Sequence, residues 1–165
     1  MHKFIMMFAG LLGSVGVYAD SSFSLLLSGA SIHSGCQQGK GEKAKSCEFN
    51  NNNPGLGLEW AFAGNEDNGR WFTRAATYRD SFEQQAWYVS VGYRKEWQII
   101  GLVYLGAGVQ AGYLDGSGIK GVAALPMISV GSKDVALEIG YAPKTNTVGQ
   151  HKRVNVTTFS LRWSF

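Results

Sequence analysis

The stretch from Trp87 to Glu96, WYVSVGYRKE, alternates between two kinds of side chain. Large nonpolar groups occupy every second position up to Tyr93; Tyr88, Ser90 and Gly92 fall between them, and Arg94 follows. A period of two is typical of a β-strand whose two faces meet different surroundings. This stretch therefore predicts a strand with one nonpolar face and one face of small and ionisable groups.

The same alternation recurs along the rest of the chain, in segments bounded by turn-favouring residues. The eight expected strands are Phe23–His33, Pro54–Phe62, Arg70–Arg79, Ala86–Glu96, Ile100–Tyr113, Gly121–Val130, Val135–Tyr141 and Val154–Phe165. Beyond the N-terminal segment no apolar run reaches the roughly 20 residues that a transmembrane helix needs. We therefore expect an all-β fold.

The placement of charge distinguishes two architectures for alternating strands. A soluble sandwich or lipocalin-like barrel turns its bulky nonpolar groups inward, whereas a membrane barrel turns them outward. The ionisable residues within strands lie opposite the large nonpolar ones: Glu59, Arg94, Glu96, Glu138 and Arg162. A closed barrel also leaves no unpaired edge in lipid. The pattern predicts an eight-stranded antiparallel transmembrane β-barrel in the cell outer membrane.

The N-terminus has the features of an export signal. Lys3 provides a positive start, Phe4–Val17 is largely nonpolar, and Val17 and Ala19 are small residues at a cleavage site. A membrane anchor is the alternative, but the nonpolar run is short for one. We expect a cleaved signal peptide over residues 1–19 and a barrel over residues 20–165.

Export permits a disulfide between the two cysteines, Cys36 and Cys47, which would staple one loop. Two free thiols are the alternative. No CxxC motif or Cys/His metal spacing is present, so no metal site is expected. The net charge of +3, without a basic stripe, argues against nucleic acid as a partner.

The predicted connections differ in length at the two ends of the barrel. With both termini in the periplasm, the inner connections are short: Ala63–Gly69, Lys95–Ile99 and Gly131–Asp134. The outer ones include the long segments Ser34–Asn53 and Lys144–Arg153. This asymmetry is typical of outer-membrane barrels.

Strand direction brings three reactive residues to the outer end. The first and third strands run the same way and end at His33 and at Asp80-Ser81. With one strand between them, their backbones should lie roughly 10 Å apart. A His beside an Asp and a Ser can activate a hydroxyl, so these three residues are a candidate catalytic set. A rim histidine and a turn-capping Asp-Ser pair also fit the pattern.

Small residues on the inward face indicate where a ligand would fit. An eight-stranded barrel either fills with side chains or holds one slender ligand. The inward small residues are Gly55, Gly57, Ser90, Gly92, Gly106 and Gly108, which provide space or relieve curvature. Pro54 and Pro143 lie near outer strand ends, where a missing N–H either opens the wall to a lipid tail or merely ends a strand.

In these residues the chain resembles a known family, the lipid A palmitoyltransferases (PagP-type outer-membrane acyltransferases). The resemblance is strongest in Tyr78-Arg79-Asp80-Ser81-Phe82, followed at the family's spacing by Gly92 and Trp97. The segments Leu125–Gly131 and Tyr141–Pro143 and the aromatic C-terminus are also similar. His33 ends the first strand, as the family's essential His does.

The resemblance implies a function and roles for residues. His33, Asp80 and Ser81 would be catalytic, Gly92 would be the floor of the acyl pocket, and Pro54 and Pro143 would flank lateral gates. The implied reaction moves a palmitoyl chain from the sn-1 position of a glycerophospholipid to lipid A. No metal or soluble cofactor is implied, and the barrel is expected to act as a monomer.

Two other functions remain open at this point. One is a non-enzymatic small outer-membrane barrel whose long outer loops bind a surface. The other is a lipid A deacylase, for which a His-x-Ser pair late in the chain would be expected and is not found. The mass of lipid A from cells that express the chain separates the three functions.

Overall fold

The structure, a computed structural model, describes residues 22–35, 37–38, 45–46, 49–116, 118–143 and 154–165. The predicted signal peptide and the predicted disulfide between Cys36 and Cys47 lie outside these residues. Within the described residues, no helix has the length and hydropathy needed to cross a bilayer.

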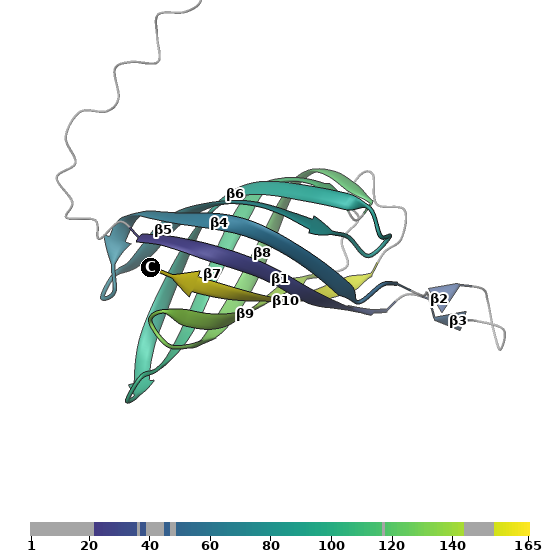
Figure 1. Ribbon diagram of the computed structural model, residues 1–165. Coiled ribbons are helices and arrows are strands. Elements are labelled where there is room, and N and C mark those ends of the chain that lie inside the picture. Colours follow the sequence, from purple (N-terminus) through teal and green to yellow (C-terminus); the bar gives the residue numbers. More distant parts are fainter. Residues whose placement is uncertain (1–21, 36, 39–44, 47–48, 117, 144–153) are drawn as a thin grey trace, which may run out of the picture.

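Eight strands close into one antiparallel barrel, which confirms the predicted fold class (Figure 1). β1 pairs with β10 on one side and with β4 on the other, so the sheet has no free edge. A further pair, β2 and β3, forms a short ribbon outside the wall. The strands are β1 (Ser22–Ser34), β2 (Gln37–Gln38), β3 (Lys45–Ser46), β4 (Asn52–Asn65), β5 (Gly69–Arg79), β6 (Gln85–Ile100), β7 (Val103–Gly116), β8 (Ile119–Gly131), β9 (Val135–Ala142) and β10 (Asn155–Ser164).

The two ends of the barrel differ. The start of β1 and the end of β10 lie together at one end, which we call the inner mouth, since Ser24 pairs with Ser164 there (Figure 1). The ends of β1 and β5 and the start of β4 lie at the opposite end, which we call the outer mouth. The β2–β3 ribbon extends from the outer mouth (Figure 1).

One predicted connection is wrong. Residues 95–99 belong to β6, which continues to Ile100, and the connection is the tight turn at Gly101-Leu102. Trp97 and Gln98 keep the alternation and pair with β7, so the ladder continues through them. The turn falls at Gly101 because its backbone has φ 54°, a conformation that glycine adopts without strain.

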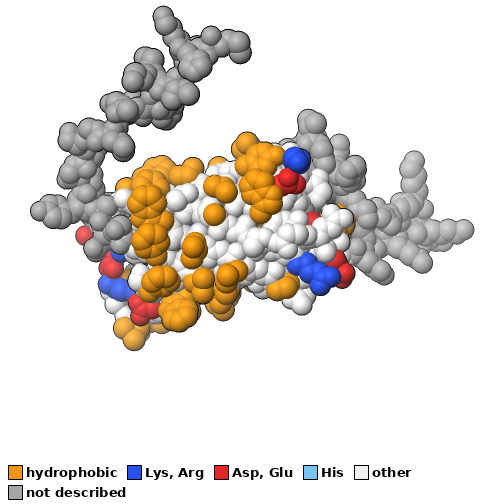
Figure 2. Space-filling view, turned by 45° about the horizontal axis from the view of Figure 1, so that its top comes forward, with side chains coloured by type: hydrophobic (Ala, Val, Ile, Leu, Met, Phe, Trp, Pro, Cys, Tyr) orange, Lys and Arg blue, Asp and Glu red, His pale blue; other side chains and the backbone are white. Residues whose placement is uncertain are grey.

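The side chains of the strands face the outer wall or the lumen as the charge pattern predicts. Val89 and Val91 are 48% and 49% exposed on the outer wall, whereas Glu59 and Arg162 are 1% and 2% exposed inside. Figure 2 shows nonpolar side chains spread over the visible wall, with charged groups near the two ends. A wall of this kind matches the hydrocarbon of a bilayer.

A buried ion network fills the inner part of the lumen. Arg74 binds Glu59 at 2.6 Å and Glu138 at 2.8 Å, and Arg94 binds the other oxygen of Glu59 at 2.5 Å. Arg162 donates to Glu138 at 3.0 Å and also pairs with Glu96. Removing one partner of such a buried network costs about 3–5 kcal/mol, because a charge is left without compensation. The network closes the lumen below the cavity described next.

Candidate active site

His33 and Ser81 meet at the outer mouth. Ser81 Oγ lies 2.9 Å from His33 Nε2, although the two residues are 48 positions apart in the chain. β1 delivers His33 at its outer end, and Ser81 follows the outer end of β5 by two residues. The His33 ring stacks on Phe49 with centroids 4.5 Å apart, and Phe49 in turn meets the edge of Phe82. Aromatic contacts therefore hold the imidazole against the serine hydroxyl.

Asp80 organises the turn that presents Ser81. Its Oδ1 accepts the backbone N–H groups of Phe82 and Gln84, both at 2.9 Å, and the residue is buried. Its backbone N–H also donates to the carbonyl of Gln84 at 2.8 Å. Glu83 in the same turn has φ 65°. The Asp80 carboxylate therefore closes the turn that carries Ser81.

Ser31 and Asn53 form further polar contacts next to His33 and Ser81. The Ser31 hydroxyl donates to Asn53 Oδ1 at 2.5 Å and lies 3.5 Å from Ser81 Oγ. Asn53 Nδ2 donates to the carbonyl of Arg79 at 3.0 Å, which ties this group to the end of β5. Ser31 and Asn53 were not predicted from the sequence. The parity of β1, which points Ser31 and His33 to the same side, is the signal that would have identified Ser31.

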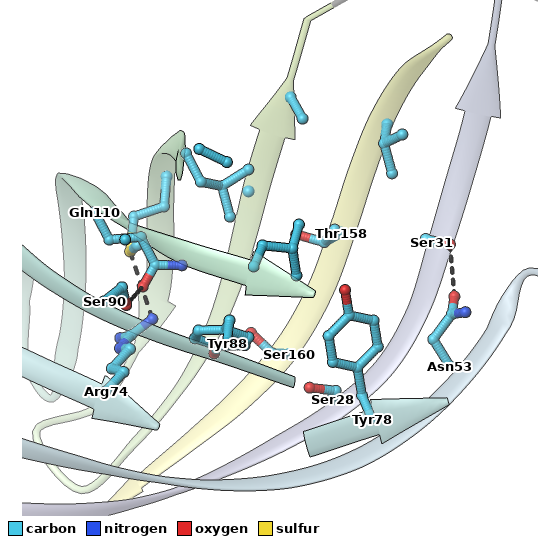
Figure 3. A pocket seen from close by; sticks show the side chains of 18 of the residues that line it. Ser28, Ser31, Asn53, Arg74, Tyr78, Tyr88, Ser90, Gln110, Thr158 and Ser160 are labelled. Atoms are coloured by element: carbon cyan, nitrogen blue, oxygen red, sulfur yellow. Dashed lines mark hydrogen bonds between the residues drawn. The ribbon is translucent and has the colours of Figure 1, made fainter. Parts of the chain in front are cut away.

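A cavity of about 230 Å³ descends from these residues into the barrel. Ser31, Asn53 and Ser81 line one end of it, and Ser90, Gln110 and Arg74 line the other. Figure 3 shows the Ser31–Asn53 pair well separated from the Ser90–Gln110 pair, with Tyr78 and Tyr88 between them. The intervening wall is largely nonpolar, with Leu114, Ala123, Leu125, Val156 and Phe159 among its residues. The cavity has the form expected for a hydrocarbon chain whose ester end lies at the outer mouth.

Gly92 is buried, as its inward parity predicts, but it is not among the residues that line the cavity. A Cβ at this position would lie 2.4 Å from Cζ of Phe72, so the Phe72 ring already occupies the space in front of the glycine. The role of Gly92 as pocket floor stays a prediction. The described lining instead reaches Ser90, two residues closer to the outer mouth.

The barrel wall is interrupted at two places beside the cavity. The β8–β9 ladder runs only from Met127–Gly140 to Gly131–Ala136, so within the described residues Ile119–Pro126 have no β9 partner. Pro126 stands where the pairing stops, and Pro143 lies one residue beyond β9. Pro lacks the N–H that would extend the ladder. The outer half of this seam is therefore open in its hydrogen bonding.

The second interruption lies between β1 and β4. Their register shifts between Ser28 and Ala30, opposite Asn53-Pro54. Pro54 is inside β4 rather than at its start, and it is exposed on the outer wall. Both predicted gate prolines thus lie next to breaks in the wall, and their role as gates stays a prediction.

Metal-ligating side chains do not gather at this site. Across the part of the chain that the structure describes, no group of three His, Cys, Asp or Glu residues is placed to hold a metal ion.

Comparisons with known proteins identify the family of this chain. None of the curated proteins compared with the chain matches it. Among solved structures, the chain is similar to Neisserial surface protein A (NspA) at 14% identity and a TM-score of 0.40, over 88% of this chain and 96% of that one. That similarity is too low to bear on function.

A family model described as "Antimicrobial peptide resistance and lipid A acylation protein PagP" matches residues 16–157, which is most of the chain. The match includes His33 and Ser81 and ends at residue 157, within β10. The chain therefore belongs to the PagP family of lipid A palmitoyltransferases.

Proposed function

We propose that His33 and Ser81 are the reacting pair with which this barrel transfers a palmitoyl group from a phospholipid to lipid A. The observation that carries the proposal is the 2.9 Å contact between Ser81 Oγ and His33 Nε2 at the mouth of a largely nonpolar cavity. A serine needs an adjacent base to become a nucleophile, and a neutral imidazole provides one. In this role His33 carries its proton on Nδ1, so that Nε2 accepts from Ser81.

The first half of the reaction uses the pair as nucleophile and base. The Ser81 oxygen attacks the carbonyl carbon of the sn-1 ester while His33 Nε2 takes the hydroxyl proton. The bond from the carbonyl carbon to the glycerol oxygen then breaks, and His33 returns the proton to that oxygen. The lysophospholipid leaves, and the palmitoyl group stays on Ser81.

The second half repeats these steps with lipid A. A lipid A hydroxyl gives its proton to His33 and attacks the acyl-Ser81 carbonyl, and the proton then passes to Ser81 Oγ as the ester bond breaks. Ser31 and Asn53 are positioning residues, because their hydrogen bonds connect Ser81 to the ends of β1 and β5. Asp80 supports the same geometry through the turn.

The location of the site fits substrates that arrive through the membrane. The nonpolar outer wall supports a location of the barrel in the outer membrane, where phospholipid and lipid A are both present. The open seam between β8 and β9 lies beside cavity-lining residues of both strands, Leu125 and Ala142. The acyl chain of a lipid would enter the cavity laterally through this seam. One barrel holds the described site, which supports a monomer as the acting unit.

The test is the intact mass of the purified barrel after incubation with a phosphatidylcholine that carries a palmitoyl sn-1 chain. Without lipid A, the wild type should gain the mass of one palmitoyl group, and Ser81→Ala should not. His33→Gln should slow donor cleavage by about 10²-fold or more, since general base catalysis contributes that much. Ser132→Ala, in an inner turn, is the matched control and should behave as wild type. Cleavage of the donor by Ser81→Ala at the wild-type rate would contradict the proposal.

A further inference from the structure

A separate cavity of about 40 Å³ lies at the inner mouth, which we call the inner pocket. It shares no lining residue with the cavity that leads from His33 and Ser81, because the ion network lies between the two. Its volume is enough for about three waters or one small polyatomic anion. The charged residues that line it are Glu66, Arg70, Arg94, Glu96, Lys133 and Arg162.

Arg94 brings a buried donor without a partner to the inner pocket. The residue is 2% exposed, and it donates from Nη1 to Glu59 at 2.5 Å and from Nε to Glu96 at 3.3 Å. Its Nη2 is buried and has no hydrogen-bond partner among the described residues. Of the two cavities, Arg94 lines only the inner pocket. A buried N–H without an acceptor is costly, more so on a charged group, so an acceptor in this pocket would stabilise the barrel.

Positive charge exceeds negative charge around the inner pocket. Within the network, three arginines balance three glutamates: Arg74, Arg94 and Arg162 against Glu59, Glu96 and Glu138. At the rim, Lys133 and Arg70 share the carboxylate of Glu66, at 2.8 Å and 3.8 Å. Asp67 and Asp134 occupy the same turns but do not line the pocket. The lining residues and their direct partners therefore leave one cation without a carboxylate, which favours an anion as the ligand.

A phosphate group fits this set of donors. Guanidinium and ammonium groups form short, charge-assisted hydrogen bonds to phosphate oxygens. Arg94 Nη2 would donate from the floor of the pocket, and Arg70 and Lys133 from its rim. Glu66 would oppose an anion, but both of its oxygens are held by Lys133, at 2.9 Å and 2.8 Å.

We infer that the inner pocket binds a phosphate group through Arg94, Arg70 and Lys133. The ligand is free phosphate or the headgroup phosphate of an anionic phospholipid that reaches over the rim. It satisfies the buried N–H of Arg94 and balances the additional positive charge, and it joins the start of β5 to the turn between β8 and β9. The inference goes beyond the proposed function and does not depend on it, because no step of acyl transfer uses these residues.

The experiment is calorimetric titration of the purified barrel in dodecyl maltoside, a detergent without phosphate, at an ionic strength held constant with sodium chloride. One series adds inorganic phosphate. The other adds glycerophosphoglycerol, the headgroup of phosphatidylglycerol without acyl chains, which cannot occupy the acyl cavity. Arg94→Lys keeps a charge beside Glu59 and removes Nη2, and Lys133→Gln removes a rim cation. Lys120→Gln, from an exposed ion pair with Asp115 at the outer mouth, is the matched control.

The wild type should bind one equivalent of phosphate or of glycerophosphoglycerol. Saturation by phosphate would support the free ion as the source, and saturation by glycerophosphoglycerol alone would support the headgroup. Arg94→Lys and Lys133→Gln should each weaken binding about tenfold or more, because each loses a hydrogen bond to a charged group. Lys120→Gln should bind as the wild type does.

Three results would overturn the inference. The first is a folded wild type that binds neither compound, which would mean that water alone fills the pocket. The second is wild-type affinity in a folded Arg94→Lys or Lys133→Gln barrel, and the third is an equal loss in Lys120→Gln. Heat-modified migration in gels shows which variants are folded, and Lys133 is exposed, so its variant decides even if Arg94→Lys does not fold.

Discussion

Ser81 is presented to His33 by a turn that the neighbouring carboxylate closes. Asp80 Oδ1 accepts two backbone N–H groups across that turn. Asp80→Asn keeps an acceptor oxygen and should retain most of the activity. Asp80→Ala removes it and should lower activity at least about tenfold, because small displacements of a reacting group are costly. Initial rates of donor cleavage measure both variants. Equal losses in Asn and Ala would show that the negative charge matters rather than the turn.

Gly92 is a second position at which a small substitution, the addition of one Cβ atom, has a large expected effect. An added Cβ would meet the Phe72 ring at 2.4 Å and the Val109 carbonyl oxygen at 2.7 Å, and the carbonyl cannot move away cheaply. Gly92→Ala should therefore destabilise the barrel by about 1–3 kcal/mol, as overpacking does. Urea unfolding in detergent measures the change. A fully stable Gly92→Ala barrel that takes shorter chains would contradict this expectation and would support Gly92 as the pocket floor.

Sequence reasoning reached some of these residues and missed others for physical reasons. Strand direction alone brings His33 and Ser81 to one mouth, because antiparallel strands alternate in direction. The Ser31–Asn53 bond depends on the register shift beside Pro54, which alternation does not reveal. The parity of Gln110 is predictable, but its bond to Ser90 depends on a side-chain rotamer.

At the scale of the element, the seam between β8 and β9 is the feature with the clearest consequence. Its inner half is paired, and its outer half, beyond Pro126, is not paired within the described residues. A double variant, Leu125→Cys with Ala142→Cys, joined by a short bis-maleimide, should lose most activity because the tail's route is closed. The two single variants with the same reagent are the controls. Full activity in the joined barrel would mean that lipid arrives elsewhere.

The strands themselves were largely predictable, and their ends were not. Alternation identifies every barrel strand because one face meets lipid and the other the lumen. It did not locate the β6–β7 turn, since alternation continues through Trp97 and Gln98 and only Gly101 marks the turn. The β2–β3 ribbon was also not predicted, because two-residue strands are too short to show a period.

For the whole molecule, the ion network is both the closure of the lumen and a source of stability. Glu59→Gln leaves Arg74 and Arg94 with a neutral partner and should cost about 3–5 kcal/mol. Glu66→Gln, in an exposed pair with Lys133, should cost at most about 1 kcal/mol. The free energy of unfolding in urea compares them. Equal effects would mean that the network contributes no more than a surface pair.

The direct test of the account is the mass of lipid A from cells that express the chain or its Ser81→Ala variant, with folded barrel confirmed in both membranes. The wild type should add one palmitoyl group to lipid A, and the variant should add none. Unchanged lipid A with folded wild-type barrel, or equal palmitoylation by Ser81→Ala, would contradict the claim that His33 and Ser81 carry the transfer.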